Sequence, residues 1–490
     1  MFTNYTSKQK VVIWSIVAVF TTIFGLESLV NHYMYRTCAY DLGIYNNMMY
    51  SYSHFKMNYT SLQQPLVNHA FGDHFEPIFM LISPFYWLFG SYTLLIFQII
   101  MIVLGGIGAM RYVQLYTQSN NAAIAALIHF YVIWGVYSAL CFDFHNNVTG
   151  AMLVPWLAVY VHQSRWRYAT AIFALMLISK ENIALYAVFV CLGLALHYRQ
   201  LKPTRNLLLV FSSVAAVYFV CVIKVIIPHF RPDDAVYLYE GSYRALGTDT
   251  ADMLKNIFLY PGKIFALLFE NTSGDPFYNG IKSELHFSVL VSGGIFLFYK
   301  PQFAVMLISV YAQKLFINDA TRWGINNHYS IEFVPVIVFA TALFIHDKAS
   351  GRMKMVLPFV IAATTACYTF TKLESRVSIW FDKTNLQFYS KEHYQSAESV
   401  PALNQALSNL PFTEKDAVSA QTLIVSRLCN RDSIYMYPNV TYANYIVLTP
   451  KLGHYPLNDS TFQVSLDTLS KSAYWQLIQK TDAVLVYKRN

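Results

Sequence analysis

The sequence predicts an all-α polytopic membrane bundle followed by a small α/β domain. Of the 490 residues, 55% are hydrophobic and only 13% are charged, whereas soluble domains carry about 25% charged residues. Apolar runs of bilayer-crossing length recur along residues 1–371. From about 372 to 490 the composition becomes that of a soluble domain. We therefore predict a membrane domain over 1–371 and a separate domain over 372–490.

Eleven apolar runs predict eleven membrane crossings. Six are long enough to need little argument, and they cover 11–30, 92–110, 122–140, 207–228, 329–345 and 355–370. Five are shorter and are bounded by charged or proline-containing breaks, which is typical of short or tilted spans. These five cover 148–161, 168–179, 183–196, 285–299 and 303–317.

The positions of the basic residues predict the orientation of the bundle. With a cytoplasmic N-terminus, most basic residues near the spans fall in cytoplasmic segments, as the positive-inside rule requires, with Asp347 as the only acid among them. These residues are Lys8, Lys10, Arg111, Arg165, Arg167, Arg199, Lys202, Arg205, Lys300, Lys348, Arg352 and Lys354. Eleven crossings then place the C-terminal domain outside, with long outer loops at 31–76 and 229–284. The net charge of +8 follows this asymmetry, so we predict no nucleic-acid partner.

The tail from 372 to 490 has the pattern of a small α/β unit. Helical spacing predicts a helix over 394–410 that ends before Pro411, and TLIVSRL at 422–428 predicts a second one. Residues 417–419 and the β-branched or aromatic runs IYMY, NYIVLTP and AVLVYK predict strands. The tail contains no nucleotide-binding glycine fingerprint.

The stretch VNHAFGDHFEPIF at 67–79 places several ionisable groups directly before an apolar run. His69, Asp73 and Glu76 are spaced i, i+4 and i+7, so they would share one face if the stretch were helical. Because only about 13 residues separate Pro77 from Gly90, we predict a short re-entrant or interfacial helix over 78–89 before the next full span.

Five turns on the predicted outer side carry acid–histidine or acid–base groups, at 41, 73–76, 143–145, 180–181 and 319–332. Snorkelling and helix capping explain single residues of this kind. They do not explain the repetition on one side, and ionisable groups at membrane depth mark functional sites. We therefore predict one outward-facing cavity. Its predicted lining includes Asp41, Asp73, Glu76, Asp143, Glu181 and Arg322.

The same motifs resemble a known family. YDLGIYNNMMY (40–50), NHAFGDHFEPIFMLISPFYWLF (68–89), FDFHNN (142–147), SKENIALY (179–186) and NNHYSIEFVPVIVFA (326–340) are together similar to an uncharacterised family of bacterial polytopic membrane proteins. That family, a domain of unknown function, is grouped with the GT-C glycosyltransferases, which use polyprenyl-phosphate-linked sugars. The resemblance implies a GT-C-like fold, a place in the bacterial inner membrane and a catalytic carboxylate in the first outer loop. This sequence departs from the family at two positions. It has Asn182 where the family commonly has an acidic residue, and Asp143 where the family commonly has Glu.

Sugar transfer from a lipid phosphate needs a base and cations for the leaving phosphate. The resemblance assigns the base to Asp41; the alternative is an N-cap for a helix beginning at Leu42. Asp73 and Glu76 are further catalytic candidates. Lys180, Arg322 and His328 are the candidate phosphate donors, although Lys180 could instead pair with Glu181. The remaining candidates for substrate binding are His69, His74, Asp143, His145 and Glu181.

Cofactors and partners follow from the same chemistry. The sequence predicts no specific cofactor, but a divalent metal could bind His69, Asp73, His74 and Glu76, or Asp143 with His145. The expected partners are a polyprenyl-phosphate-linked sugar, membrane lipids, and an acceptor that is a glycan, lipid or protein.

Two other classes of function stay open. A transporter or lipid flippase would also carry charges within its spans, at sites marked by broken helices. Here the charges gather at one outer rim and no inverted repeat is visible. A binding or assembly component of a membrane complex could act through the tail alone, and it would not need charged span ends.

Overall fold

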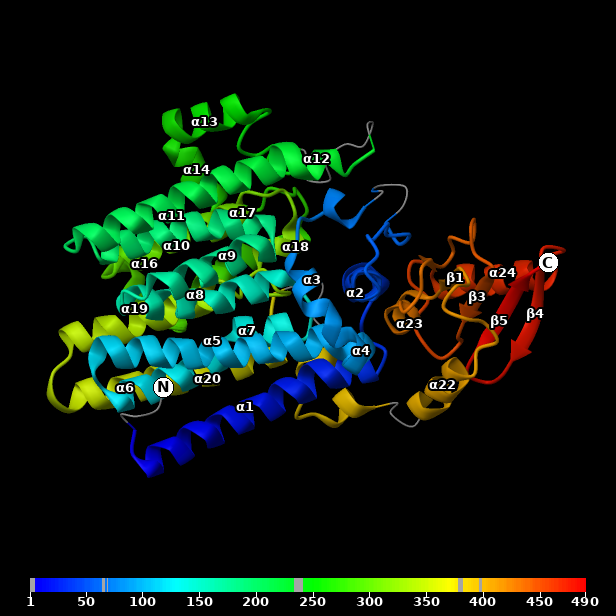
Figure 1. Ribbon diagram of the computed structural model, residues 1–490, viewed down its shortest axis with the longest axis horizontal. Coiled ribbons are helices and arrows are strands. Elements are labelled where there is room, and N and C mark those ends of the chain that lie inside the picture. Colours follow the sequence, from blue (N-terminus) through cyan, green and yellow to red (C-terminus); the bar gives the residue numbers. More distant parts are fainter. Residues whose placement is uncertain (1–4, 64–66, 68, 233–240, 378–381, 396–398) are drawn as a thin grey trace. The chain divides into compact units, whose positions relative to one another are not determined.

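The computed structural model describes residues 5–63, 67, 69–232, 241–377, 382–395 and 399–490. The chain forms two compact units (Figure 1). The helical unit consists of Met1–Phe24, Gln98–Val225 and Val236–Gln387. The mixed unit consists of Gly25–Phe97, Ile226–Ala235 and Phe388–Asn490. We describe each unit by itself.

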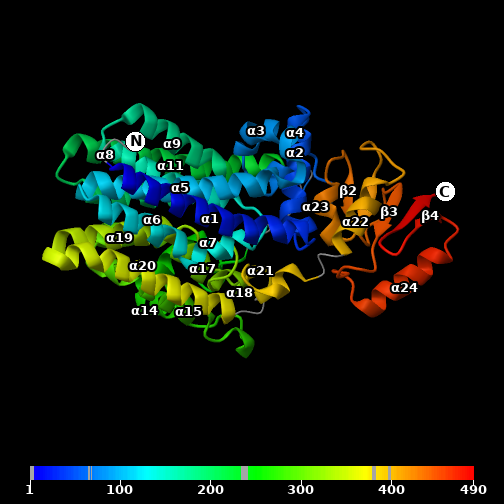
Figure 2. The same ribbon diagram turned by 90° about the horizontal axis from the view of Figure 1, so that it is seen from below.

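Helices make up the helical unit, and each of the eleven predicted apolar runs is helical over most of its length. The long helices of this unit lie side by side, for example α10 beside α11 and α8 beside α9 (Figures 1 and 2). The helices are α1 (Ser7–Tyr33, which continues into the mixed unit), α5 (Thr93–Thr117), α6 (Asn120–Val132), α7 (Trp134–Leu140), α8 (Asn146–His162), α9 (Trp166–Ser179), α10 (Glu181–His197), α11 (Lys202–Cys221), α13 (Thr250–Leu259), α14 (Pro261–Leu267), α15 (Ile281–Val291), α16 (Pro301–Met306), α17 (Ile308–Leu315), α18 (Ala320–Trp323), α19 (Phe333–Lys348), α20 (Gly351–Glu374) and α21 (Lys383–Leu386).

Not all of these helices are long enough to cross a bilayer. Within the described residues, four meet the length and hydropathy of a span: Ser7–Tyr33, Ile78–Thr117, Lys202–His229 and Gly351–Glu374. The count is five if α6 and α7, bent by 45° at the extended residue Ile133, form one span. The predicted eleven crossings are therefore not confirmed, because several apolar runs are broken into short helices. The run at 303–317, for instance, divides into α16 and α17.

Glycines bring the helices close together. A Cβ added to Gly106 in α5 would lie 2.2 Å from the ring of Tyr131 in α6, and one added to Gly150 in α8 would lie 2.4 Å from Ile183 in α10. Small residues at helix contacts are typical of membrane bundles, because packing rather than apolar burial holds such helices together.

The mixed unit is built around a five-stranded sheet with the order β2-β1-β3-β5-β4. β1 is parallel to β2 and β3, whereas β5 is antiparallel to β3 and β4. The strands are β1 (Val418–Ala420), β2 (Ile434–Met436), β3 (Tyr445–Leu448), β4 (Trp475–Lys480) and β5 (Leu485–Arg489). The helices of the tail are α22 (Ser399–Ser408), α23 (Thr422–Leu428) and α24 (Asp459–Ser470). The small C-terminal α/β fold is confirmed, although β4 and α24 were not predicted.

The first outer loop belongs to the core of this mixed unit. Met34, Tyr35, Ala39 and Leu62 are buried in the same apolar cluster as Val418 and other residues of the sheet. The loop carries α2 (Ile44–Ser53). The boundary at 371/372 stays a prediction, but the contacts group residues 25–97 with the tail.

A chain of short helices follows the first loop. α3 (Ile78–Ile82), a 3₁₀ turn (Ser83–Phe85) and α4 (Tyr86–Phe89) precede Gly90, whose φ of 51° ends the run before α5. Ile78, Phe79 and Ile82 are buried, whereas Leu81, Trp87 and Leu88 are 59%, 66% and 73% exposed. The short helix predicted over 78–89 thus forms in segments, and its exposed apolar face suits a membrane interface.

Candidate functional site

Asp41 lies on a strained piece of backbone. Its φ of 86° and ψ of −104° fall outside the regions that residues other than glycine usually adopt. Strain of this kind persists only where the surrounding structure imposes it, and it gathers at functional sites. The alternative N-cap prediction is wrong: α2 begins at Ile44, and Gly43 occupies its N-cap position. The Asp41 side chain is half-buried.

Helix α23 of the tail holds the backbone around Asp41. The Ala39 N–H donates to Thr422 Oγ1 at 3.1 Å, and the Cys429 thiol at the end of α23 donates to the Gly43 carbonyl at 3.0 Å. Thr37 Oγ1 lies 3.0 Å from Ser426 Oγ. Each contact fixes a residue on one side of Asp41, so the tail imposes the conformation of the predicted catalytic loop.

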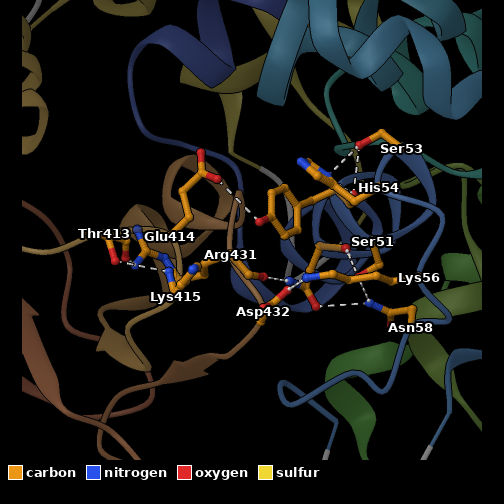
Figure 3. A network of polar contacts seen from close by, with 12 residues as sticks. Ser51, Ser53, His54, Lys56, Asn58, Thr413, Glu414, Lys415, Arg431 and Asp432 are labelled. Atoms are coloured by element: carbon orange, nitrogen blue, oxygen red, sulfur yellow. Dashed lines mark hydrogen bonds and ion pairs between the residues drawn. The ribbon is translucent and has the colours of Figure 1, made fainter.

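A second set of contacts joins α2 to the tail (Figure 3). The buried Asn47 amide donates to the carbonyls of Cys429 at 3.3 Å and Arg431 at 2.8 Å, and it accepts from Asn58 Nδ2 at 3.1 Å. Lys56 Nζ lies 2.6 Å from Asp432 Oδ1, but both side chains are about half exposed, so this pair contributes little. The buried amides are the stronger link, because a buried polar group left unpaired is costly.

The segment from His69 to Glu76 is not a continuous helix, so the predicted shared helical face is wrong. His69 is extended and caps a 3₁₀ turn (Ala70–Gly72), with its Nδ1 accepting from the Phe71 N–H at 3.0 Å. Asp73 Oδ2 accepts from Gln63 Nε2 at 2.6 Å. Glu76 is fully buried and acts electrostatically on Tyr52. Burial lowers the pKa of His69, which favours the neutral ring.

His74 completes this segment, and a glycine fixes its path. His74 is half-buried and its N–H donates to the Ala70 carbonyl at 3.3 Å. Gly72 lies against Phe230, so an added Cβ would be 2.6 Å from the Phe230 carbonyl oxygen. Arg231 Nε donates to the Gly72 carbonyl at 2.6 Å. Only glycine allows this close approach.

Gly72→Ala is therefore expected to destabilise the mixed unit by about 1–3 kcal/mol, because the neighbouring backbone must move to admit the methyl group. Chemical denaturation of the purified protein measures the change. Gly453→Ala is the matched control in the same unit, since the nearest atom to an added Cβ there lies 3.9 Å away. Equal stabilities of the two variants would show that the Phe230 segment yields freely.

A buried group of charges lies in the helical unit. We call it the His328 cluster; it consists of His145, Lys180, Lys314, Arg322, His328 and Glu332. His145 and His328 stack with their ring centroids 3.4 Å apart, and Phe142 stacks on both rings. Glu332 Oε1 accepts from Asn147 Nδ2 at 2.8 Å. Lys314 Nζ donates to the Gly324 carbonyl at 2.9 Å, and Arg322 pairs with Asp319 at 3.2 Å.

The surroundings of His328 are positive. Burial, together with the charges of His145, Lys180, Arg322 and Lys314, holds the pKa of His328 well below its usual range. The ring is therefore neutral, and Lys180, Arg322 and Lys314 are the cationic side chains that act on it. A positive potential in a buried site is suited to an anion.

The remaining predicted residues of this unit lie beside the cluster. Asp143 is buried and has a φ of 41°, and its carbonyl accepts from Gln98 Nε2 at 3.0 Å. The same Gln98 side chain accepts from the His145 N–H at 3.2 Å. Glu181 is the first residue of α10, directly after Lys180, and both are buried. The structure thus brings together the predicted residues of three separate turns.

Sequence reasoning missed two members of this cluster. Lys314 is the single charged residue of the apolar run at 303–317, so no neighbouring charged residue marked it as part of a site. Glu332 ends the predicted outer turn at 319–332, but its position alone indicates no role. A signal was present, because a lysine inside a predicted span needs a buried partner, and Glu332 acts electrostatically on Lys314 in this way.

Two predictions about the site have different outcomes. Among the residues that the structure describes, no three His, Cys, Asp or Glu side chains come together as a metal site, so the proposed metal ligands are not assembled. The single cavity joining Asp41, Asp73 and Glu76 to Asp143, Glu181 and Arg322 stays a prediction, because these residues belong to different units.

Comparisons with known proteins concern the whole chain. A family model described as "Predicted membrane protein (DUF2079)" matches residues 31–486. The crystal structure of ArnT from Cupriavidus metallidurans bound to undecaprenyl phosphate is similar in fold, with 11% identity and a TM-score of 0.53 over 99% of this chain and 98% of that chain. The apo structure of the same ArnT has 12% identity and a TM-score of 0.46 over 96% and 98%. No curated protein sequence matches the chain.

Proposed function

Because the chain belongs to the DUF2079 family of predicted membrane proteins, as its motifs indicated, and has the ArnT fold, we propose that it is a membrane glycosyltransferase of the GT-C type. It moves a sugar from a polyprenyl-phosphate donor to an acceptor on the outer side of the bacterial inner membrane. The ArnT structure holds undecaprenyl phosphate, and we expect a lipid of this class here.

The positive surroundings of His328 carry this proposal. Lys180 and Arg322 supply donors for the phosphate that leaves with the lipid, and charge-assisted contacts to phosphate oxygens are strong. Lys314 adds a further buried charge. Glu332 interacts electrostatically with Lys314 and Lys180 and offsets part of their charge.

Asp41 supplies the base. A carboxylate within hydrogen-bond reach of the acceptor hydroxyl takes its proton as the hydroxyl oxygen attacks the anomeric carbon and the bond to the phosphate oxygen breaks. The strained backbone at Asp41 is the observation that favours it over Asp73 and Glu76. Asp73 and Glu76 then have positioning roles in the segment after the first loop.

The proposal includes the eleven-crossing topology with the tail outside. Single cysteines placed at Arg199 and Asn409, in a background without the native cysteines, should label from opposite sides of the membrane with an impermeant thiol reagent. Arg199 should react only after the membrane is opened. Labelling of both positions from the same side would overturn the topology.

The function is tested with purified protein in two steps. Mass spectrometry of the co-purifying lipids should detect a polyprenyl phosphate. Liposomes containing protein and a radiolabelled polyprenyl-phosphate sugar should then release or transfer label, and protein heated before reconstitution serves as the blank. A protein that binds no such lipid and instead moves a solute across liposomes would support the transporter.

A further inference from the structure

A polar cavity of about 530 Å³ lies wholly inside the mixed unit. Its walls come from α22, α23, the segment at 410–414, and two points nearer the N-terminus, Tyr35 and Ser91. Ligand sites of this size are common, and a few well-placed polar groups set their specificity. No role in the proposed transfer has been given to any side chain that lines it.

Arg427 of α23 is a charged residue of the cavity wall whose guanidinium keeps N–H donors that are not hydrogen-bonded to described residues. Its Nη2 donates to the His32 carbonyl at 2.7 Å and to the Tyr92 hydroxyl at 3.1 Å. The guanidinium lies over the rings of Tyr35 and Tyr92, 4.8 Å and 5.2 Å from their centroids. Among the residues that the structure describes, neither Nε nor Nη1 has a hydrogen-bond partner; Nε is enclosed by protein, whereas Nη1 is not and is the donor left for a ligand. The group is held in a fixed plane and can still bind an anion.

Arg431 lines the same cavity, but its guanidinium donates hydrogen bonds to backbone carbonyls of the mixed unit. Its Nε donates to the Leu428 carbonyl at 2.7 Å, and its Nη1 donates to the carbonyls of Thr413 and Asp416 at 3.2 Å and 3.3 Å. Figure 3 shows it beside Glu414 and Thr413. Arg431 contributes positive charge to the wall, whereas Arg427 contributes the free donor.

The other walls offer groups suited to sugar hydroxyls. Glu414 is exposed, and the hydrogen bonds that it accepts from described residues are long, from Tyr50 at 3.4 Å and Asn430 at 3.5 Å. Asn404 Oδ1 accepts from the Tyr35 hydroxyl, which leaves its two N–H donors for a ligand. Phe412 and Tyr35 add aromatic surface. A hydroxyl both donates and accepts, so a carboxylate beside an amide pairs it fully.

We propose that this cavity, the Arg427 cavity, binds an acidic sugar: a hexose unit whose carboxylate pairs with Arg427 and whose hydroxyls bind Glu414 and Asn404. A doubly charged phosphate fits less well, because it would lie near the Glu414 carboxylate. A neutral sugar would leave the Arg427 donor unpaired in a buried site.

The position of the cavity makes it an acceptor site. Helix α23, which carries Arg427, also holds the Asp41 loop through Thr422 and Cys429. An acceptor anchored at Arg427 is thus bound by the same element that positions the predicted base. The acceptor role rests on the proposed function, whereas the binding of an acidic sugar does not.

Binding of a disaccharide of galacturonic acid to the purified full-length chain tests the proposal. Calorimetry without any donor lipid should detect binding at low salt, with the galactose disaccharide of the same linkage at least about tenfold weaker. Arg427→Gln should weaken the acidic ligand about tenfold or more, because one charge-assisted contact is lost. Glu414→Gln should weaken the acidic and the neutral disaccharide by a similar factor, about threefold to fivefold, because a charge-assisted contact to a sugar hydroxyl is lost. A structural defect would weaken both ligands in both variants, whereas loss of the Arg427 contact affects the acidic ligand.

Controls separate the possible failures. Lys471→Gln removes a positive charge from an exposed site on the same unit and should leave binding unchanged. Equal binding of the neutral disaccharide, or inorganic phosphate that competes as strongly as the acidic one, would overturn the proposal. Asp41→Asn should keep sugar binding and lose transfer. Transfer without acidic-sugar binding therefore contradicts only the cavity, and binding without transfer contradicts only the proposed function.

Discussion

Asp41→Asn is expected to lower the rate of sugar transfer by about 10²- to 10⁴-fold, the usual contribution of a positioned general base. Asparagine is the informative substitution because it is nearly isosteric with aspartate, so it meets the backbone conformation at this position (φ 86°, ψ −104°) with the same steric demand. It also keeps the size and one acceptor oxygen of the side chain while removing the base. Initial rates with a labelled donor in liposomes measure the effect.

The design needs a folded control. Asp459→Asn makes the same chemical change on α24, where Asp459 pairs with His454 at 3.0 Å and is exposed, and it should leave transfer unchanged. Both variants should elute and melt as the unmodified protein does. If Asp41→Asn retains full activity, the base is another group, and Asp73 and Glu76 become the next candidates.

The helical half of the fold was largely predictable because each predicted apolar run is helical over most of its length. The points at which helices are interrupted were harder to predict. Ile133 is an ordinary apolar residue, yet it is extended and bends α6 against α7 by 45°. Strand β4 was not predicted, because its sequence WQLIQK is mostly exposed and therefore has no continuous apolar run to mark it as a strand.

The site was predictable in part. Sorting charges by side found His145, Lys180, Arg322 and His328, which the helical unit does bring together. The helical spacing of His69, Asp73 and Glu76 predicted a helix that does not form. His69 instead caps a 3₁₀ turn, and the close approach of Gly72 to Phe230 fixes a different path for the backbone. No local pattern shows that Asn47 binds carbonyls of residues 429 and 431, because such contacts join segments far apart in the sequence.

The second large effect concerns the stability of the helical unit. Glu332→Leu is expected to lower the free energy of unfolding by about 3–5 kcal/mol, the cost of leaving a buried charge without its partner. Glu332 is 5% exposed, binds Asn147 at 2.8 Å and interacts electrostatically with Lys314 and Lys180. Leucine would fill the space but leave both lysines uncompensated. Denaturant unfolding in detergent measures the loss.

Glu332→Gln separates the charge from the hydrogen bond. The glutamine oxygen can still accept a hydrogen bond from Asn147, so Glu332→Gln should lose less stability than Glu332→Leu. The difference between the two unfolding free energies measures the contribution of the hydrogen bond to Asn147. Lys255→Leu, at an exposed site of the same unit, controls for a new surface leucine. An anion bound between the lysines would take over the role of the lost carboxylate. A polyprenyl phosphate should therefore stabilise Glu332→Leu more than the unmodified chain, whereas equal stabilisation would place the phosphate elsewhere.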